Sequence, residues 1–126
     1  MDEYRGAKFI GIIGHESVSH NGSKTTVYFL QVQVDGAMFV VKHRYHDFKD
    51  FYDKLVADGH KLPVLPPKKF LGSFNKDFIE KRQQELSLWL HLLCSWDPSS
   101  THPDPRLSEH FKEFMLQNKE PLDKDM

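Results

Sequence analysis

Three prolines within residues 63–67 constrain the fold of this 126-residue chain more than any other feature. Proline fixes its own φ, lacks a backbone N–H and pushes the preceding residue toward extended geometry, so this stretch forms neither helix nor central strand. A stiff, polyproline-like segment is therefore predicted for Leu62–Lys69. Val64 and Leu65 lie between the prolines and are expected to be partly exposed.

The sequence before this segment has the period of β-strands. Tyr28 and Leu30 alternate with polar residues in a run that continues to Val34, which is typical of a half-buried strand. Asn-Gly at 21–22 and Asp-Gly at 35–36 are turn signals, and the second is a strong hairpin signal because type I′ turns need positive φ. Three antiparallel strands are predicted, over Lys8–His15, Thr25–Val34 and Met38–His43.

Helical spacing begins where the strand pattern ends. Apolar residues recur at i, i+3, i+4, i+7 and i+8 over Phe48–Val56, and Gly59 follows at the position of a C-terminal cap. A longer helix is predicted from Asn75 or Lys76 to near Trp96, and a short one over 107–115. The expected fold is α+β: a three-stranded antiparallel meander packed against a helical subdomain of three or more helices.

Composition narrows the class of protein. The net charge is −1, so no global positive field would gather nucleic acid, and any anion must be bound by a local cluster. The single cysteine, Cys94, allows no internal disulfide and lies in an apolar run, where a buried side chain is expected. No stretch approaches the roughly 20 apolar residues of a membrane span, and the first residues do not resemble a signal peptide.

We therefore expect one domain over residues 1–126, with its core at about 8–116 and a flexible tail over 118–126. The compartment expected from these features is cytoplasmic, and any membrane contact would be peripheral.

Two motifs and one arginine then appear in a recognisable order. Arg44–Phe48 reads Arg-Tyr-His-Asp-Phe at the junction of the third strand and the first helix, and Leu62–Lys68 fits the pattern apolar-Pro-x-x-Pro-x-Lys. Arg82 lies early in the long helix. Together these residues resemble the signatures of the phox-homology (PX) family, over about Lys8–Leu116. The resemblance implies a phosphoinositide-binding module of membrane trafficking, similar to that of sorting nexins.

The resemblance also implies a role for each residue of a phosphatidylinositol 3-phosphate site. Arg44 would hold the 3-phosphate, and Tyr45 would form the floor under the inositol ring. Lys68 would contact the 1-phosphate, and Arg82 would bind the 4- and 5-hydroxyls. These residue types suit the ligand, because the arginine fork donates two hydrogen bonds to one phosphate and a nearby helix N-terminus adds positive potential.

Beside that pocket, the resemblance implies that Val64 and Leu65 insert into the membrane. Burial of one such side chain in lipid contributes about 1.5–3 kcal/mol at most, so insertion would reinforce head-group binding and could not replace it. The implied location is the cytoplasmic face of endosomal membranes.

Structural roles for the same residues remain open at this point. Arg44 could pair with Asp47 or Asp50, and Tyr45 could be an ordinary core residue. Arg82 falls on the buried side of its helix, where a charged group needs a partner, and a ligand is one candidate.

His43 is a departure from the family pattern, in which Arg-Arg often precedes the aromatic residue. Because successive strand residues point to opposite faces, His43 should not line the same pocket as Arg44. We hypothesise that His43 adds sensitivity to pH.

Other classes of function fit the sequence less well. Pro63–Pro66 has the Pro-x-x-Pro pattern of an SH3 ligand, so a protein-interaction module with weak lipid binding is the alternative; partners could also bind through a larger parent chain. No nucleophile–base pair or glycine-rich phosphate loop is evident, so no enzyme is expected. The eight histidines lack ligand spacing, so no metal and no cofactor are expected.

Overall fold

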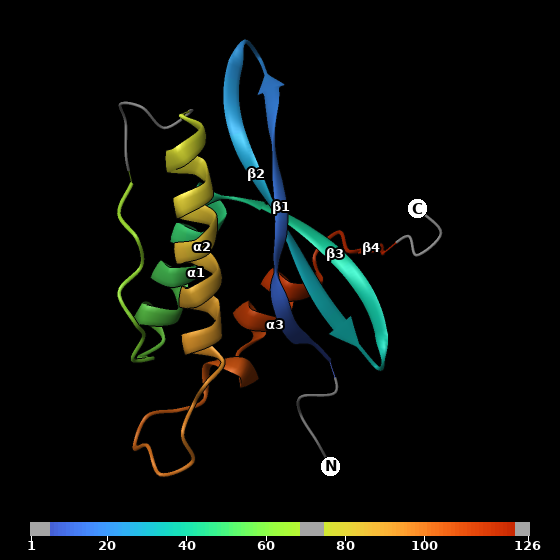
Figure 1. Cartoon of the computed structure of the whole chain (residues 1–126). Helices are drawn as coiled ribbons and strands as arrows, with labels where there is room; N and C mark the ends of the chain where they lie inside the picture. Colours follow the sequence, from blue (N-terminus) through green and yellow to red (C-terminus); the bar gives the residue numbers. More distant parts are fainter. Residues whose placement is uncertain (1–5, 69–74, 123–126) are drawn as a thin grey trace.

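The computed structural model describes residues 6–68 and 75–122, and in it an antiparallel sheet lies beside a group of helices (Figure 1). The sheet has the order β1-β2-β3-β4, and each neighbouring pair is antiparallel. Its strands are β1 (Lys8–His20), β2 (Ser23–Val34), β3 (Ala37–Arg44) and β4 (Glu120–Pro121). The predicted meander is confirmed as β1–β3, and the short strand β4 is an addition.

The β1–β2 hairpin is longer than the sequence pattern predicted. Strand pairing continues to His20 and Ser23, next to a two-residue turn at Asn21 and Gly22, which have φ of 53° and 79°. These backbone angles are those of a type I′ turn, whose twist matches the flanking strands, so pairing extends up to the turn itself. The resulting arm brings Lys24 and its neighbours beside the helices.

The three predicted helices are all present. They are α1 (Tyr45–Ala57), α2 (Lys76–Leu93) and α3 (Glu109–Leu116), and the 3-10 turn η2 (Pro105–Leu107) precedes α3. Asn75 caps α2, since its side-chain oxygen accepts hydrogen bonds from the N–H groups of Asp77 and Phe78 at 2.9 and 3.3 Å. Gly59, at φ 88°, ends α1 as expected. α2 ends at Leu93, before the predicted Trp96.

The core between sheet and helices is built around aromatic rings. Phe51 stacks on Phe114 with centroids 4.3 Å apart, and Trp89 meets the ring of Phe51 edge to face at 6.0 Å. The predicted helical stripes supply most of this core. This packing fixes α1, α2 and α3 against one another, and so fixes the two helices that hold Tyr45 and Arg82, two of the expected site residues.

The chain after α3 returns to the sheet. Glu120 and Pro121 pair with β3, and the N–H of Leu122 donates to the carbonyl of Met38 at 3.0 Å. This part of the expected flexible tail is therefore a short edge strand, and residues 123–126 of that tail lie outside the described residues.

Candidate functional site

A cavity of about 720 Å³ lies where β2, β3, α1, the proline segment and α2 meet. All four expected ligand residues line it, although they come from four different parts of the chain. The cavity is lined by Lys24, Thr25, Thr26, Tyr28, Arg44, Tyr45, His46, Lys49, Tyr52, Val64, Leu65, Pro67, Lys68, Phe78 and Arg82. Five of these residues are Lys or Arg and none is Asp or Glu, so the cavity is suited to an anion.

Arg44 occupies the N-cap position of α1, where its side chain makes no capping hydrogen bond. The carboxylates that could have paired with it have other partners: Asp47 lies 3.4 Å from His43, and Asp50 lies 3.7 Å from Lys54. Among the described residues, Arg44 makes no ion pair. The structural role considered for this arginine is thus wrong, and its guanidinium is available to a ligand.

Tyr45 and Arg82 form one wall of the cavity together. The Arg82 guanidinium lies over the Tyr45 ring, 4.1 Å from its centroid, and 4.7 Å from the ring of Phe78. Arg82 is only 5% exposed, and its Nε is buried without a hydrogen-bond partner in the described part of the chain. An unsatisfied buried donor is unusual in a folded protein, because leaving it unpaired costs free energy.

The backbone of the proline segment, here residues 62–68, is held by three side chains. The Trp89 Nε1–H donates to the carbonyl of Pro63 at 2.9 Å, and the Tyr45 hydroxyl donates to that of Pro66 at 2.5 Å. Arg82 donates to the carbonyl of Pro67. Burial raises the pKa of Tyr45, in part offset by the charges of Arg82 and Lys49, so its hydroxyl remains a donor at neutral pH.

Val64 and Leu65 differ sharply in exposure. Val64 is 88% exposed, whereas Leu65 is 8% exposed and belongs to the hydrophobic core. The expectation that both side chains insert into a membrane is therefore corrected for Leu65. Of these two neighbouring side chains, only that of Val64 faces outward.

Several residues of the cavity wall were not expected from the sequence. Lys24 reaches it because β2 begins before the predicted start at Thr25, and that extension depends on turn geometry rather than on alternation; Thr25 and Thr26 lie within the predicted strand. A signal was present for Lys49, which follows Tyr45 by four residues and so lies on the same face of α1. Lys49 itself pairs with Asp53 at 2.7 Å.

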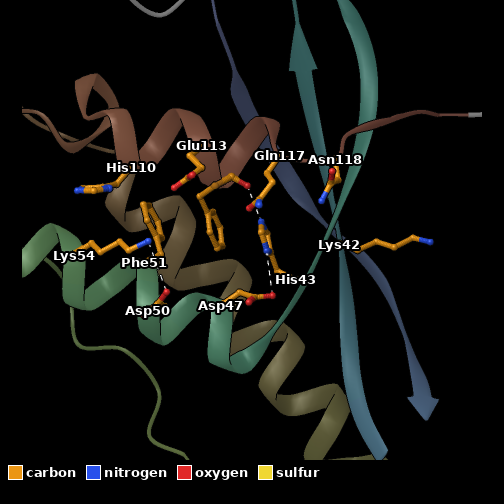
Figure 2. A pocket seen from close by; sticks show the side chains of 11 residues that line it. Lys42, His43, Asp47, Asp50, Phe51, Lys54, His110, Glu113, Gln117 and Asn118 are labelled. Carbon is orange, nitrogen blue, oxygen red and sulfur yellow. Dashed lines mark hydrogen bonds and ion pairs between the residues drawn. The ribbon is translucent and has the colours of Figure 1, made fainter. Parts of the chain in front are cut away.

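His43 lies outside this cavity, as the strand alternation predicted. Its ring is 6% exposed and stacks on Phe114 at 3.9 Å, with Nε2 2.7 Å from the Phe114 carbonyl oxygen. Nδ1 lies 3.4 Å from Asp47 in α1, and Figure 2 shows the imidazole between this carboxylate and α3, in the wall of a second, smaller pocket. His43 therefore joins β3, α1 and α3.

Asp47 is the shared partner of this arrangement. Partial burial acts to raise the pKa of Asp47, but hydrogen bonds from His43 and from the backbone N–H of Arg44, with the charges of both residues, lower it overall. The carboxylate thus stays ionised at neutral pH and fixes the backbone at the mouth of the cavity.

Other candidate chemistry is not supported in the described ranges 6–68 and 75–122. Burial raises the pKa of Cys94 to about 11, which keeps the thiol protonated and unreactive at neutral pH. In these ranges, no group of three or more His, Cys, Asp or Glu side chains is placed to hold a metal ion. None of the helices described there has the length and hydrophobicity needed to span a bilayer.

Comparison with known proteins identifies the family. The family model of the PX domain matches residues 31–118, so the chain belongs to the PX domain family. Human sorting nexin-13 is 33% identical over 85 residues, which cover 65% of this chain and 8% of that protein. Mouse sorting nexin-33 is 36% identical over 80 residues, which cover 60% of this chain and 12% of that protein. Human sorting nexin-16 is 36% identical over 87 residues, which cover 67% of this chain and 25% of that protein.

A solved structure agrees with this assignment. The X-ray structure of a designed CISK-PX domain is 27% identical, has a TM-score of 0.70, and covers 84% of this chain and 96% of its own. The chain spans a quarter or less of the length of the sorting nexins that it matches. It is a PX domain similar to those of sorting nexins, in a class of phosphoinositide-binding, peripheral membrane modules that are in general non-enzymatic.

Proposed function

We propose that this PX domain binds phosphatidylinositol 3-phosphate and thereby docks the protein that carries it on endosomal membranes. The observation that carries the proposal is the position of Arg44. Its guanidinium lines a cavity at the start of α1 that has five Lys or Arg residues and no Asp or Glu among its described lining residues, and it has no ion-pair partner among the described residues. A dianionic phosphate there would receive the arginine fork and the positive end of the helix dipole together.

The remaining ligand residues suit the rest of the head group. Tyr45 offers a ring already flanked by the Arg82 guanidinium, on which an inositol ring can rest. Lys68 is the last residue of the anchored proline segment and would meet the 1-phosphate, which is the phosphate nearest to the bilayer. The guanidinium of Arg82 lines the cavity and would offer N–H donors to ring hydroxyls. In that pose, recognition of the 3-phosphate would rest on Arg44, while Arg82 would contact the 4- and 5-hydroxyls.

Membrane contact would come from the same side of the domain. Val64 lines the cavity and is 88% exposed, so its side chain is free to enter the acyl region while the head group is bound. Leu65 would stay in the core and support the segment from below. Head-group binding and insertion of Val64 would then add, as in other modules that need two membrane signals.

The alternative of an SH3-type partner has less support. Such a groove reads an extended proline segment through its backbone carbonyls and its apolar side chains. Here the carbonyls of Pro63, Pro66 and Pro67 already accept hydrogen bonds from side chains of the domain. A partner protein would have to break these bonds first.

Co-sedimentation with vesicles tests the proposal. Phosphatidylcholine vesicles with 3-, 4- or 5-phosphorylated phosphatidylinositol, or with bisphosphates, are compared for wild type, Arg44→Ala and the matched control Lys112→Ala, which removes a partly exposed lysine of α3 outside the cavity. We expect selective binding to 3-phosphate vesicles, lost at least tenfold in Arg44→Ala and retained in Lys112→Ala, with unchanged circular dichroism. Equal binding to all vesicles, or full binding by a folded Arg44→Ala, contradicts it.

A further inference from the structure

His46 is a cavity residue that the proposed function has not used. It is the second residue of α1, its side chain is exposed, and it lines the cavity beside Arg44 and Tyr45. Within the described chain it makes no hydrogen bond, ion pair or ring contact. The imidazole of His46 therefore makes no contact that stabilises the fold. The ring nitrogens of His43, in contrast, both face oxygen atoms.

The charged groups near His46 are of one kind on the cavity side. The cations that line the cavity with it are Lys24 of β2, Arg44 of β3, Lys49 of α1, Lys68 of the proline segment and Arg82 of α2. Within residues 6–68 and 75–122, no carboxylate lines the cavity. The nearest acidic residues along α1 are engaged elsewhere: Asp47 with His43, Asp50 with Lys54 and Asp53 with Lys49.

A bound phosphate would thus be the anionic partner of this imidazole. We propose that His46 couples phosphoinositide binding to proton uptake, so that the domain holds its head group more tightly as the pH falls. This inference rests on the proposed function, because it concerns the same cavity and the same 3-phosphate.

The physical reason is linkage between two ligands, the proton and the head group. Histidine is the side chain whose charge ordinarily changes between pH 5 and 8. A proton on His46 adds a positive charge beside the phosphate, so the protonated form binds the anion better, and the bound anion holds the proton better by the same factor. Affinity therefore rises as pH falls, and the gain is lost as pH rises and the imidazole gives up its proton.

The phosphate itself titrates in the opposite sense. A phosphate monoester takes up its second proton near pH 6, which weakens binding to any cationic site at low pH. This effect is shared by the wild type and by variants of His46. The ratio of their dissociation constants at each pH therefore isolates the contribution of the imidazole.

The test measures binding to phosphatidylcholine vesicles with 3-phosphorylated phosphatidylinositol at pH 5.5 and 7.5, for wild type, His46→Asn and the control His102→Asn, whose exposed side chain is outside the cavity. The advantage of wild type over His46→Asn should be about fivefold larger at pH 5.5 than at pH 7.5, the low end of typical coupling energies. His102→Asn should follow the wild type at both pH values.

The outcomes separate this inference from the proposed function. Selective binding at pH 7.5 with the same pH profile in wild type and His46→Asn overturns the inference and leaves the proposed function standing. No binding by either protein at either pH overturns both. A second measurement needs no membrane: in NMR titrations, soluble inositol 1,3-bisphosphate should move the titration midpoint of the His46 ring upward, and an unmoved midpoint with bound ligand contradicts the coupling.

Discussion

Val64 and Leu65 are adjacent, yet their substitution to alanine should have opposite consequences. Val64 is 88% exposed, so Val64→Ala removes two methyl-sized groups that have few contacts within the domain. If these groups enter lipid, their loss costs about 0.8 kcal/mol for each, or about 1.6 kcal/mol in total, as an upper value. That is a roughly 15-fold weaker affinity for vesicles, since about 1.4 kcal/mol corresponds to a tenfold change. The free energy of unfolding should change by less than about 0.5 kcal/mol.

Leu65→Ala is the matched comparison. Leu65 is 8% exposed and packed in the core, so its truncation should lower the free energy of unfolding by about 2–5 kcal/mol. Vesicle binding of the remaining folded protein should change little through lost insertion, because this side chain does not face outward.

The assay pairs two ligands for each variant. Vesicle binding is measured by co-sedimentation, and binding of soluble inositol 1,3-bisphosphate is measured by calorimetry. Val64→Ala should weaken the first and leave the second within about twofold, because only the vesicle offers acyl chains. An equal loss for both ligands would refute the reasoning, as it would place Val64 in head-group binding. An unchanged vesicle affinity would refute it as well, because insertion would then contribute nothing.

The remaining predictions concern the framework of the cavity. Trp89→Phe should lower the free energy of unfolding by about 1–3 kcal/mol in urea titrations, because the carbonyl of Pro63 loses its donor; an unchanged midpoint would contradict this. The pKa of Asp47 is lowered in the folded protein, so its contribution to stability is full above its usual value near 3.8 and is lost as the pH falls below that value. Asp47→Asn should therefore be less stable at pH 7 than wild type, with the difference shrinking in acid, and a constant difference between pH 7 and 2.5 would be the contrary result. Arg44→Ser should raise the free energy of unfolding by about 0.5–1 kcal/mol, because serine accepts hydrogen bonds at an N-cap, and it should remove vesicle binding. A lower free energy of unfolding in this variant would contradict the proposal that Arg44 serves the ligand rather than the fold.

The sequence was sufficient where one local pattern determined one element. Alternation predicted the second strand, and the i, i+3, i+4 stripe of Phe48 and its successors predicted α1, because each pattern reports which face is buried. The prolines predicted an extended segment, because proline restricts the backbone directly. The ends of elements were less well predicted: β1 extends to His20, since a tight turn at Asn21 and Gly22 lets pairing run its full length.

The site could be predicted only in part, since motifs mark residues but not their surroundings. Residue order placed Arg44 and Tyr45 at a strand-to-helix junction, which the structure bears out. It could not show that Leu65 faces the core while Val64 faces outward, because that depends on the rotation of an extended segment without a sequence period. It also missed Lys24, whose place in the cavity results from tertiary packing of the hairpin arm.

The proline segment and the proposed ligand site share their supporting residues, and this has a consequence for how the domain can work. Tyr45 and Arg82 each face the cavity and each donate to a carbonyl of the segment, at Pro66 and Pro67. The Tyr45 ring and the Arg82 guanidinium also pack on each other, so each side chain is held at two places. Such side chains lose little conformational freedom when a ligand arrives, so less of the binding free energy is lost to ordering them. The same bonds fix the direction in which Val64 points. A head group that settles on Tyr45 would therefore meet a segment already aimed at the bilayer, and the two proposed contributions to membrane binding would both depend on one set of hydrogen bonds.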